Sequence, residues 1–256
     1  MTTRGLLLPS LFALVALAVL LGLGAWQLDR LAWKNALLAQ VQERAARPAE
    51  PAPPRAEWGG VTRQGDEYRH VRATGWFDHA AETLIYTVLS DSKSDMKGPG
   101  FLVITPLMLP DNSAILVNRG FVPNDRRDRR TRSEGQITGP VTVTGLLRLP
   151  EEPSWFVPAN DPLRNAWYRR DPEEIGRARG VDVVAPFLID ADATPNPGGL
   201  PLGGETRLAF TNRHLEYALT WFGLAVTLVG VYIAFVISRL RTGRDAPSDG
   251  TDPGRV

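Results

Sequence analysis

Two uncharged runs, one near each end of the chain, decide its architecture. The first reads GLLLPSLFALVALAVLLGLGAWQL over residues 5–28, and the second reads YALTWFGLAVTLVGVYIAFVIS over residues 217–238. As α-helices that rise about 1.5 Å per residue, both runs are long enough to cross the roughly 30 Å hydrocarbon core of a bilayer. The sequence therefore predicts transmembrane helices at residues 5–28 and 212–238, with the lipid bilayer as their surroundings.

The first run could instead belong to a cleaved signal peptide. It is longer than the apolar core of such a peptide, and no pair of small residues marks a cleavage site before a polar start. We therefore expect an uncleaved anchor and a two-pass protein with both termini on one side of the membrane.

The charges beside the two spans predict their orientation. Arg4 precedes the first span, in a short tail of residues 1–4. The tail of residues 239–256 contains Arg239, Arg241 and Arg244 directly after the second span. By the positive-inside rule both tails are cytoplasmic. The arginine and alanine bias suggests a bacterial genome, so we expect the bacterial inner (cytoplasmic) membrane, with the large intervening domain in the periplasm.

Between the spans the predicted order is an amphipathic stalk, a connector and a folded domain. Helical spacing continues over residues 29–46, the Pro-rich stretch RPAEPAPPR occupies residues 47–55, and a β-rich domain covers residues 56–211.

Within this domain, alternating or β-branched segments cut by turn residues favour an antiparallel sheet, as a sandwich or a small barrel. These segments are residues 68–76, 83–89, 101–109, 114–119, 141–149 and 185–189. One short helix is expected after the N-cap Asp171, ending at Gly180. The fold class is thus a membrane-anchored α+β protein.

Composition excludes several functions. The chain has 29 Lys and Arg against 28 Asp and Glu, so its net charge of +1 disfavours nucleic acid as a partner. The absence of cysteine excludes disulfides, thiolate metal sites and covalently attached c-type haem. We find no nucleophile elbow, P-loop, zincin or dinucleotide motif, and so expect no catalytic residues. A membrane-anchored enzyme of another class remains a hypothesis.

The chain has three histidines, and their settings differ. His70 lies in a strand pattern and His79 in a predicted turn, where both are expected to be structural. Asp78 beside His79 could bind a divalent metal, but two adjacent ligands are weak evidence. His214 instead opens the second span, at the expected membrane interface.

On a helix, His214 shares a face with Tyr217, Ala218 and Trp221. A histidine above aromatic rings and a small residue suits haem, whose iron histidine often binds, and Arg213 and Arg207 could meet its propionates. The alternative is an ordinary interfacial helix start, in which Asn212 caps the helix and the aromatic residues belong to the interfacial belt.

The arginine run RRDRRTR, residues 126–132, is the densest positive charge in the domain. It lacks the interleaved aromatic residues of a nucleic-acid site. We expect a solvated loop, or one that touches anionic headgroups or an acidic partner.

Several motifs follow one another in a fixed order along the chain. They are Trp26-Gln27, Arg30, Trp33-Lys34, GWFD at 75–78, PGF at 99–101, TPL at 105–107, LVNRGFVP at 116–123, WYRRD at 167–171 and NRHLEYALTWFGLA at 212–225. Their order resembles the surfeit-locus (Shy-type) cytochrome c oxidase assembly family over residues 26–225. The resemblance is most specific in LVNRGFVP and in NRHLEYALTW. At the start of the latter segment the family often has Asn-Asn-His or Asn-His, whereas this chain has Asn-Arg-His.

This resemblance implies a non-enzymatic assembly factor that helps place haem a into subunit I of the terminal oxidase. It implies that His214 ligates the haem iron, that Tyr217 and Trp221 belong to the binding site, and that haem a synthase is a partner. Arg213 is where this chain departs from the family pattern, and its charge could strengthen a contact with a propionate. It also implies structural roles for Gly75, Asn118, Arg119 and Gly120. A scaffold that stabilises oxidase assembly intermediates without binding haem is the alternative.

Overall fold

The computed structural model separates the chain into two compact units, which we describe one at a time. One unit is helical and combines residues 1–39 with 209–256, and the other spans residues 40–208 and contains the β-sheet. The residues that the structure describes are 4–90, 96–206 and 212–244.

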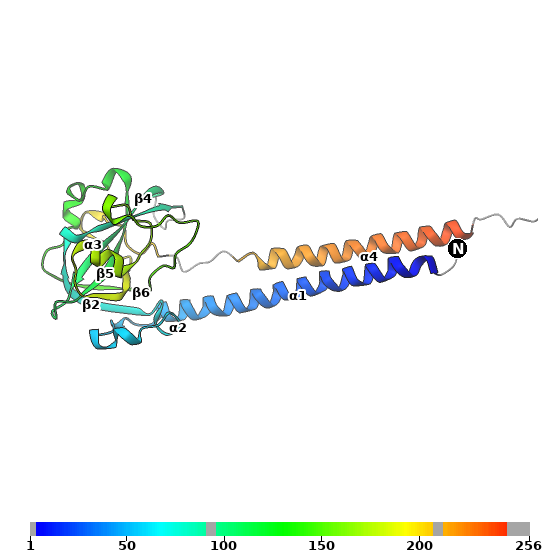
Figure 1. Cartoon of the computed structure of the whole chain (residues 1–256), viewed down its shortest axis with the longest axis horizontal. Helices are drawn as coiled ribbons and strands as arrows, with labels where there is room; N and C mark the ends of the chain where they lie inside the picture. Colours follow the sequence, from blue (N-terminus) through cyan, green and yellow to red (C-terminus); the bar gives the residue numbers. More distant parts are fainter. Residues whose placement is uncertain (1–3, 91–95, 207–211, 245–256) are drawn as a thin grey trace, which may run out of the picture. The chain divides into compact units, whose positions relative to one another are not determined.

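The helical unit contains α4 (His214–Arg244) and α1 (Arg4–Ala46) up to residue 39, and the two helices run side by side in opposite directions (Figure 1). The ring of His214 contacts Gln27, and the hydroxyl groups of Ser10 and Tyr232 meet near the other end. Between them Gly24 allows a close approach, because a Cβ added there would lie 2.6 Å from the Phe222 ring. Small and polar side chains thus fill the contact between two otherwise apolar helices.

The less exposed residues of both helices recur at intervals of three and four, the pattern of an antiparallel coiled-coil seam. They include Ser10, Ala13, Leu17, Leu20, Gly24, Gln27 and Leu31 on α1, and His214, Ala218, Trp221, Ala225, Leu228, Tyr232 and Phe235 on α4. The remaining faces expose leucine, valine and phenylalanine.

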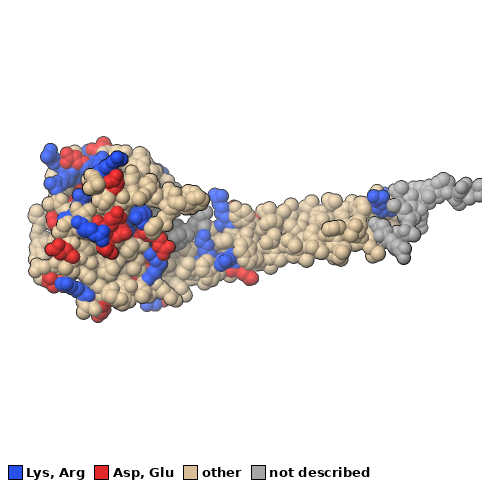
Figure 2. Space-filling view, viewed as in Figure 1, with Lys and Arg blue, Asp and Glu red and all other residues tan. Residues whose placement is uncertain are grey.

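By length and composition, each of these helices could cross a bilayer. Figure 2 shows a long surface of the pair without Lys, Arg, Asp or Glu, with charged side chains appearing at its ends. An apolar surface of this extent is typical of a membrane or protein contact. The two helices are consistent with a two-pass membrane protein.

The second unit is a small closed β-barrel. Its sheet has the strand order β1-β2-β6-β7-β5-β4-β3, and a further pairing of β2 with β4 closes the ring. Most neighbours are antiparallel, whereas β1–β2 and β5–β7 are parallel. The strands are β1 (Glu50–Pro51), β2 (His70–Phe77), β3 (Thr83–Leu89), β4 (Gly98–Met108), β5 (Ala114–Pro123), β6 (Pro140–Arg148) and β7 (Val184–Ala191). The structure therefore decides the sandwich-or-barrel alternative in favour of the barrel.

Gly75 permits the closure of the barrel. There Trp76 pairs with Met108 and Phe77 with Leu107, joining β2 to β4. A Cβ on Gly75 would lie 2.3 Å from the Met108 carbonyl oxygen, far inside contact distance. Glycine is thus needed where two strand backbones approach closely.

Strand β5 is buried along almost its whole length because both of its faces are covered. Ile115 and Val117 join the cluster with Phe187 and Leu147, whereas Leu116 packs in a second cluster with Trp167 and Ile175. This explains why its sequence reads as a continuous apolar run instead of an alternating one.

Ile175 belongs to α3 (Pro172–Arg179), which begins and ends as predicted. The Asp171 side chain accepts a hydrogen bond from the Glu174 amide at 3.0 Å, and Gly180 ends the helix in a left-handed conformation with φ of 70°. The other short elements are α2 (Arg63–Asp66) and the 3-10 turns η1 (Arg55–Gly60), η2 (His79–Ala81), η3 (Asn124–Arg126), η4 (Arg129–Gly135), η5 (Pro162–Arg164) and η6 (Pro197–Gly199).

The predicted Pro-rich connector, residues 47–55, is partly integrated into the barrel domain. Glu50 and Pro51 form β1 beside β2, and the Pro53 carbonyl accepts a hydrogen bond from the Trp58 indole at 3.0 Å. The Trp58 ring meets Phe187 edge-on, with 6.2 Å between the ring centroids. Packing by one buried tryptophan therefore attaches this stretch to the fold.

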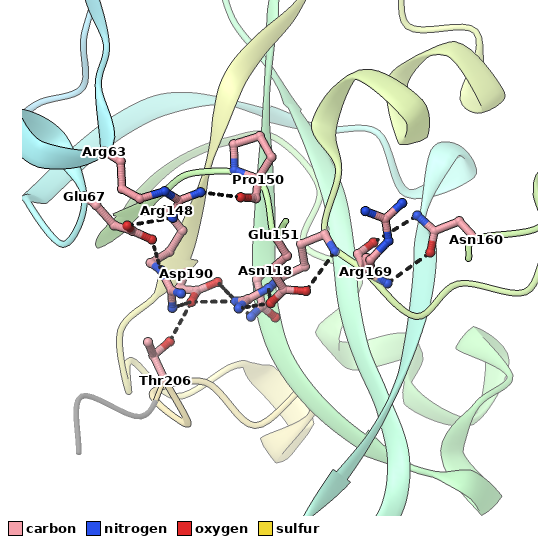
Figure 3. A network of polar contacts seen from close by, with 11 residues as sticks. Arg63, Glu67, Asn118, Arg148, Pro150, Glu151, Asn160, Arg169, Asp190 and Thr206 are labelled. Atoms are coloured by element: carbon pink, nitrogen blue, oxygen red, sulfur yellow. Dashed lines mark hydrogen bonds and ion pairs between the residues drawn. The ribbon is translucent and has the colours of Figure 1, made fainter. Parts of the chain in front are cut away.

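A buried ionic network lies at Asp190 of β7 (Figure 3). Its carboxylate accepts hydrogen bonds from Arg170 at 2.9 Å, Arg148 at 3.2 Å, Asn118 at 2.9 Å and Thr206 at 3.0 Å. Burial by itself would raise the pKa of Asp190, but the two guanidinium groups hold it below its ordinary value. The network thus joins β5, β6 and β7 to the segment before α3 and to the C-terminal end of the domain.

Candidate functional site

The N-terminus of α4 presents His214 in a defined orientation. The Asn212 side-chain oxygen accepts a hydrogen bond from the His214 amide at 3.3 Å, and the Asn212 amide group donates to Asn35 of α1 at 3.0 Å. Asn212 therefore acts as the predicted helix cap and also links the two helices.

The imidazole of His214 is held by Gln27 of α1, with 2.7 Å between Nδ1 and Oε1. Because an amide oxygen only accepts, Nδ1 carries the proton in this contact. In the neutral ring the lone pair is then on Nε2, which is the nitrogen available to a metal. Ligating histidines are commonly oriented by such a bond from the other ring nitrogen.

The other predicted site residues occupy different positions around His214. Ala218 is 1% exposed, so its side chain is covered by neighbouring residues and cannot contact a bound ligand. Tyr217 is 53% exposed, Trp221 is partly buried, and Arg213 is exposed. Tyr217 and Trp221 therefore border the surface near His214, while Arg207 lies outside the described residues.

Gln27 is a site residue that the sequence analysis did not assign. Its side chain is buried, yet it falls near the end of the first uncharged run, where its neighbours are apolar. A polar residue inside a predicted span is itself a signal, because unpaired amides are costly there. Only the antiparallel pairing of α1 with α4 reveals that its partner is His214.

On both sides of Gln27, α1 carries an exposed group of two tryptophans and an arginine. The Arg30 guanidinium lies 5.7 Å from the centroid of the Trp26 ring and 5.5 Å from that of Trp33. Tryptophan favours the membrane–water interface, and so does arginine, whose charged group is carried on an apolar stem. This group therefore fits the end of a span at the level of His214.

The other two histidines have structural partners. His70 places Nδ1 at 2.8 Å from the Arg47 carbonyl and Nε2 at 2.9 Å from the Asp192 carboxylate. Burial lowers its pKa, but these two acceptors outweigh burial, so the net shift is upward. In His79, Nε2 lies 2.9 Å from the Ile137 carbonyl and burial lowers the pKa. Within the described residues, no group of three His, Cys, Asp or Glu side chains forms a metal site.

The prediction of a solvated arginine loop is wrong for Arg132. Its guanidinium is buried and forms a two-pronged ion pair with Glu82, at 3.0 Å for the longer bond. Arg127 lies over the Phe101 ring, with 4.9 Å between the guanidinium carbon and the centroid. Charge density in the sequence does not distinguish the buried Arg132 from Arg127 and Arg130, which are exposed.

Comparison with known sequences adds the family. A model of the SURF1 family matches residues 14–226, most of the chain. The chain belongs to the SURF1 family. It is similar to surfeit locus protein 1 of Mus musculus, with 40% identity over 223 residues, 83% of this chain and 71% of the relative. It shares 39% identity with surfeit locus protein 1 of Homo sapiens over 215 residues, 80% of this chain and 69% of the relative. The relative from Takifugu rubripes is 34% identical over 241 residues, 90% of this chain and 98% of the relative.

Three residues of the LVNRGFVP segment in this SURF1-family chain have structural partners. Asn118 donates to Asp190, and the buried Arg119 guanidinium lies 4.6 Å from the Phe77 ring centroid. Burial lowers the pKa of Arg119 to about 10, so it remains charged at neutral pH. Gly120 has φ of 124°, and a Cβ there would lie 2.0 Å from the Leu202 oxygen. The LVNRGFVP segment therefore stabilises the barrel, whereas the segment at residues 212–225 contains His214, whose imidazole is suited to ligation.

Proposed function

We propose that this SURF1-family protein is a non-enzymatic assembly factor for the haem-copper terminal oxidase, cytochrome c oxidase. It assists the delivery of haem a to subunit I and binds that haem through His214. The observation that carries the proposal is the hydrogen bond between His214 Nδ1 and Gln27, because it makes Nε2 the ligand atom.

The donor set around His214 fits this group. When bound, haem a supplies an iron that takes an axial nitrogen ligand and a flat apolar ring that carries propionates. His214 offers the nitrogen, Tyr217 and Trp221 offer aromatic surface one and two turns along α4, and exposed Arg213 offers a charge-assisted partner for a carboxylate.

A delivery protein needs a site from which the cargo can leave. A single imidazole ligand is reversible, and the chain has no cysteine for covalent attachment. Gln27 fixes the ring from one side and Asn212 accepts a hydrogen bond from the His214 backbone amide, so His214 can release its ligand without rearrangement of the helix pair. A partner that binds the loaded protein and offers a better ligand would then favour transfer.

The proposed topology places this site beside both partners. The tails at residues 1–4 and 239–256 face the cytoplasm of a bacterial cell, and the barrel domain faces the periplasm. The His214 end of α4 then lies at the periplasmic surface of the inner membrane. Haem a synthase and oxidase subunit I, the proposed donor and acceptor, can be reached there by lateral diffusion in the same bilayer.

A haem-free scaffold is the second candidate. It is favoured by the exposed arginines of the η3–η4 region, such as Arg129 and Arg130, which leave positive charge available to an acidic partner. In that case His214 would serve only to join the two helices, and loss of its ring would weaken the helix pair without loss of a chromophore.

One experiment separates the two candidates. The full chain is co-expressed with the enzymes of haem a synthesis, purified in detergent and examined by reduced-minus-oxidised absorption spectroscopy. We expect the Soret and α bands of haem a in the parent protein and their loss in His214→Ala.

A matched variant at another histidine makes this result specific. His70→Gln removes another histidine and is expected to retain the bands, since His70 contacts Asp192 and a backbone carbonyl in the barrel domain. A colourless parent protein that still co-purifies with oxidase subunits contradicts haem binding and supports the scaffold.

A further inference from the structure

The loop between β6 and α3 exposes large apolar side chains on the barrel domain. Trp155 is 91% exposed, Phe156 is 80% exposed and Leu163 is 100% exposed. By contrast, Trp58 and Trp167 of the same domain are buried. Neighbouring aromatic side chains held in water are unfavourable, so they indicate a contact surface.

The backbone presents the two aromatic residues at the tip of a turn. The Val157 amide donates to the Ser154 carbonyl at 3.1 Å, which places Trp155 and Phe156 at the two central positions. Their ring centroids are 4.6 Å apart, so the pair forms one apolar unit. Prolines at 153 and 158 flank the turn and restrict its backbone.

The loop is anchored firmly enough to keep this pair exposed. Asn160 accepts hydrogen bonds from the amides of Tyr168 and Arg169 at 2.9 and 3.0 Å, and donates to Glu174 at 2.7 Å. Asp161 and Ala166 exchange backbone hydrogen bonds of 2.8 and 3.0 Å. These bonds fix the part of the loop that directly follows the turn.

We propose that Trp155 and Phe156, together with Leu163 of the same loop, form a wedge that inserts into the interfacial region of a lipid bilayer. The proposal rests on the membrane anchoring proposed above. Tryptophan and phenylalanine are the side chains that enter this region most readily, because the indole combines an apolar body with a polar N–H.

A bilayer is favoured over a protein partner by tether length and by charge. Seven residues, 207–213, join the described end of the barrel domain to the start of α4. Even when extended, seven residues reach at most about 25 Å, so an anchored chain keeps the domain near lipid and raises its effective concentration. The flanking charges are balanced, with exposed Glu152 and Arg164 of opposite sign, so insertion would depend mainly on apolar contact.

The test uses the absence of cysteine in the chain. Leu163→Cys in the full-length protein is labelled with the fluorophore NBD, and the protein is placed in nanodiscs of phosphatidylethanolamine and phosphatidylglycerol that contain doxyl-labelled lipid. We expect the label to lose most of its emission, and more with a shallow doxyl group than with a deep one, since interfacial insertion reaches about 5–10 Å.

Two further labelled proteins decide the interpretation. Leu219→Cys labels the exposed surface of α4 and reports membrane anchoring alone. Leu163→Cys combined with Trp155→Ser and Phe156→Ser removes the aromatic pair, and we expect its label to recover most of its emission. Near-ultraviolet circular dichroism should show an intact barrel, because the removed side chains are exposed.

The possible failures differ from one another. Quenching at position 219 without quenching at 163 overturns the wedge and leaves the anchoring intact. If the label at position 163 is then shielded from iodide only when oxidase is added, the loop is assigned to a protein contact. Equal quenching with and without the aromatic pair also overturns the wedge. No quenching at 219 removes the membrane anchoring on which the wedge rests.

Discussion

The barrel domain and the helix pair both bury polar side chains, but they satisfy them to different degrees. Asp190 in the barrel accepts hydrogen bonds from Arg148, Arg170, Asn118 and Thr206. His214 in the helix pair has its ring nitrogen Nδ1 bound to Gln27, and that bond leaves Nε2 as the nitrogen available to the proposed ligand. A buried carboxylate that accepts several hydrogen bonds favours a rigid structure, whereas a ring held through one nitrogen can bind and release a ligand through the other.

Removing the centre of the barrel network should produce the largest effect. In Asp190→Ala, Arg148 and Arg170 lose a buried carboxylate, and we expect the free energy of unfolding to fall by about 3–5 kcal/mol. Urea unfolding of the full chain in detergent, followed by near-ultraviolet circular dichroism, measures this change. The matched control is Glu173→Ala, which breaks the exposed pair with Arg177 and should cost less than about 0.5 kcal/mol. Similar losses in both variants would contradict the contrast.

Barrel closure should be nearly as sensitive. Gly75→Ala places a methyl group against the Met108 carbonyl, so we expect a loss of about 1–3 kcal/mol in the same unfolding measurement. Gly59→Ala is the control, because an added Cβ there meets nothing within 4 Å. An unchanged Gly75→Ala protein would show that β2 and β4 can separate without cost.

The helix pair should respond in ligand binding instead of stability. Gln27→Leu removes the acceptor that holds His214, and we expect haem a affinity to fall by about 10–100-fold, the usual range for loss of such a partner. Titration of the apo protein in detergent measures it, with barrel unfolding as the internal control. Gln27→Glu retains an acceptor and should restore most of the affinity, and equal affinities in all three proteins would remove Gln27 from the site.

Two barrel histidines should give the smallest effects, with opposite signs. The pKa of His70 is raised by folding, so its contribution to stability is full below pH 6.5 and is lost as the pH rises through the folded-state pKa. The pKa of His79 is lowered, so its contribution is lost as the pH falls below 6.5. Relative to the parent protein, His70→Gln should make stability rise more with pH, and His79→Gln should make it rise less. Unfolding curves between pH 5 and 8 test both slopes, and parallel profiles would contradict the assignment.

The elements of this fold were predictable because their signals are local. The six predicted β segments correspond to strands β2–β7, and the capping residues of α3 are those expected from Asp171 and Gly180. Side-chain alternation and helix capping depend on residues a few positions apart, so a single sequence contains them. The same holds for the two apolar helices at the ends.

The candidate site was predictable in part. His214 stands out because an ionisable ring begins an uncharged run, but its partner lies 187 residues earlier in the chain. Likewise, nothing in residues 126–132 distinguishes the buried Arg132 from its exposed neighbours, because Glu82, which pairs with it, comes from another part of the barrel.

By itself, the sequence determined the two apolar helices, the β-rich domain between them, the short capped helix and the choice of His214 as the candidate ligand. Only the tertiary structure decided the closure of β2 on β4, the parallel pairing of β5 with β7, the partners of Asp190 and the contact of Gln27 with His214. The physical reason is range. Propensity and periodicity act over a few residues, whereas pairing and burial depend on which distant segments meet, and many such pairings satisfy the same local pattern.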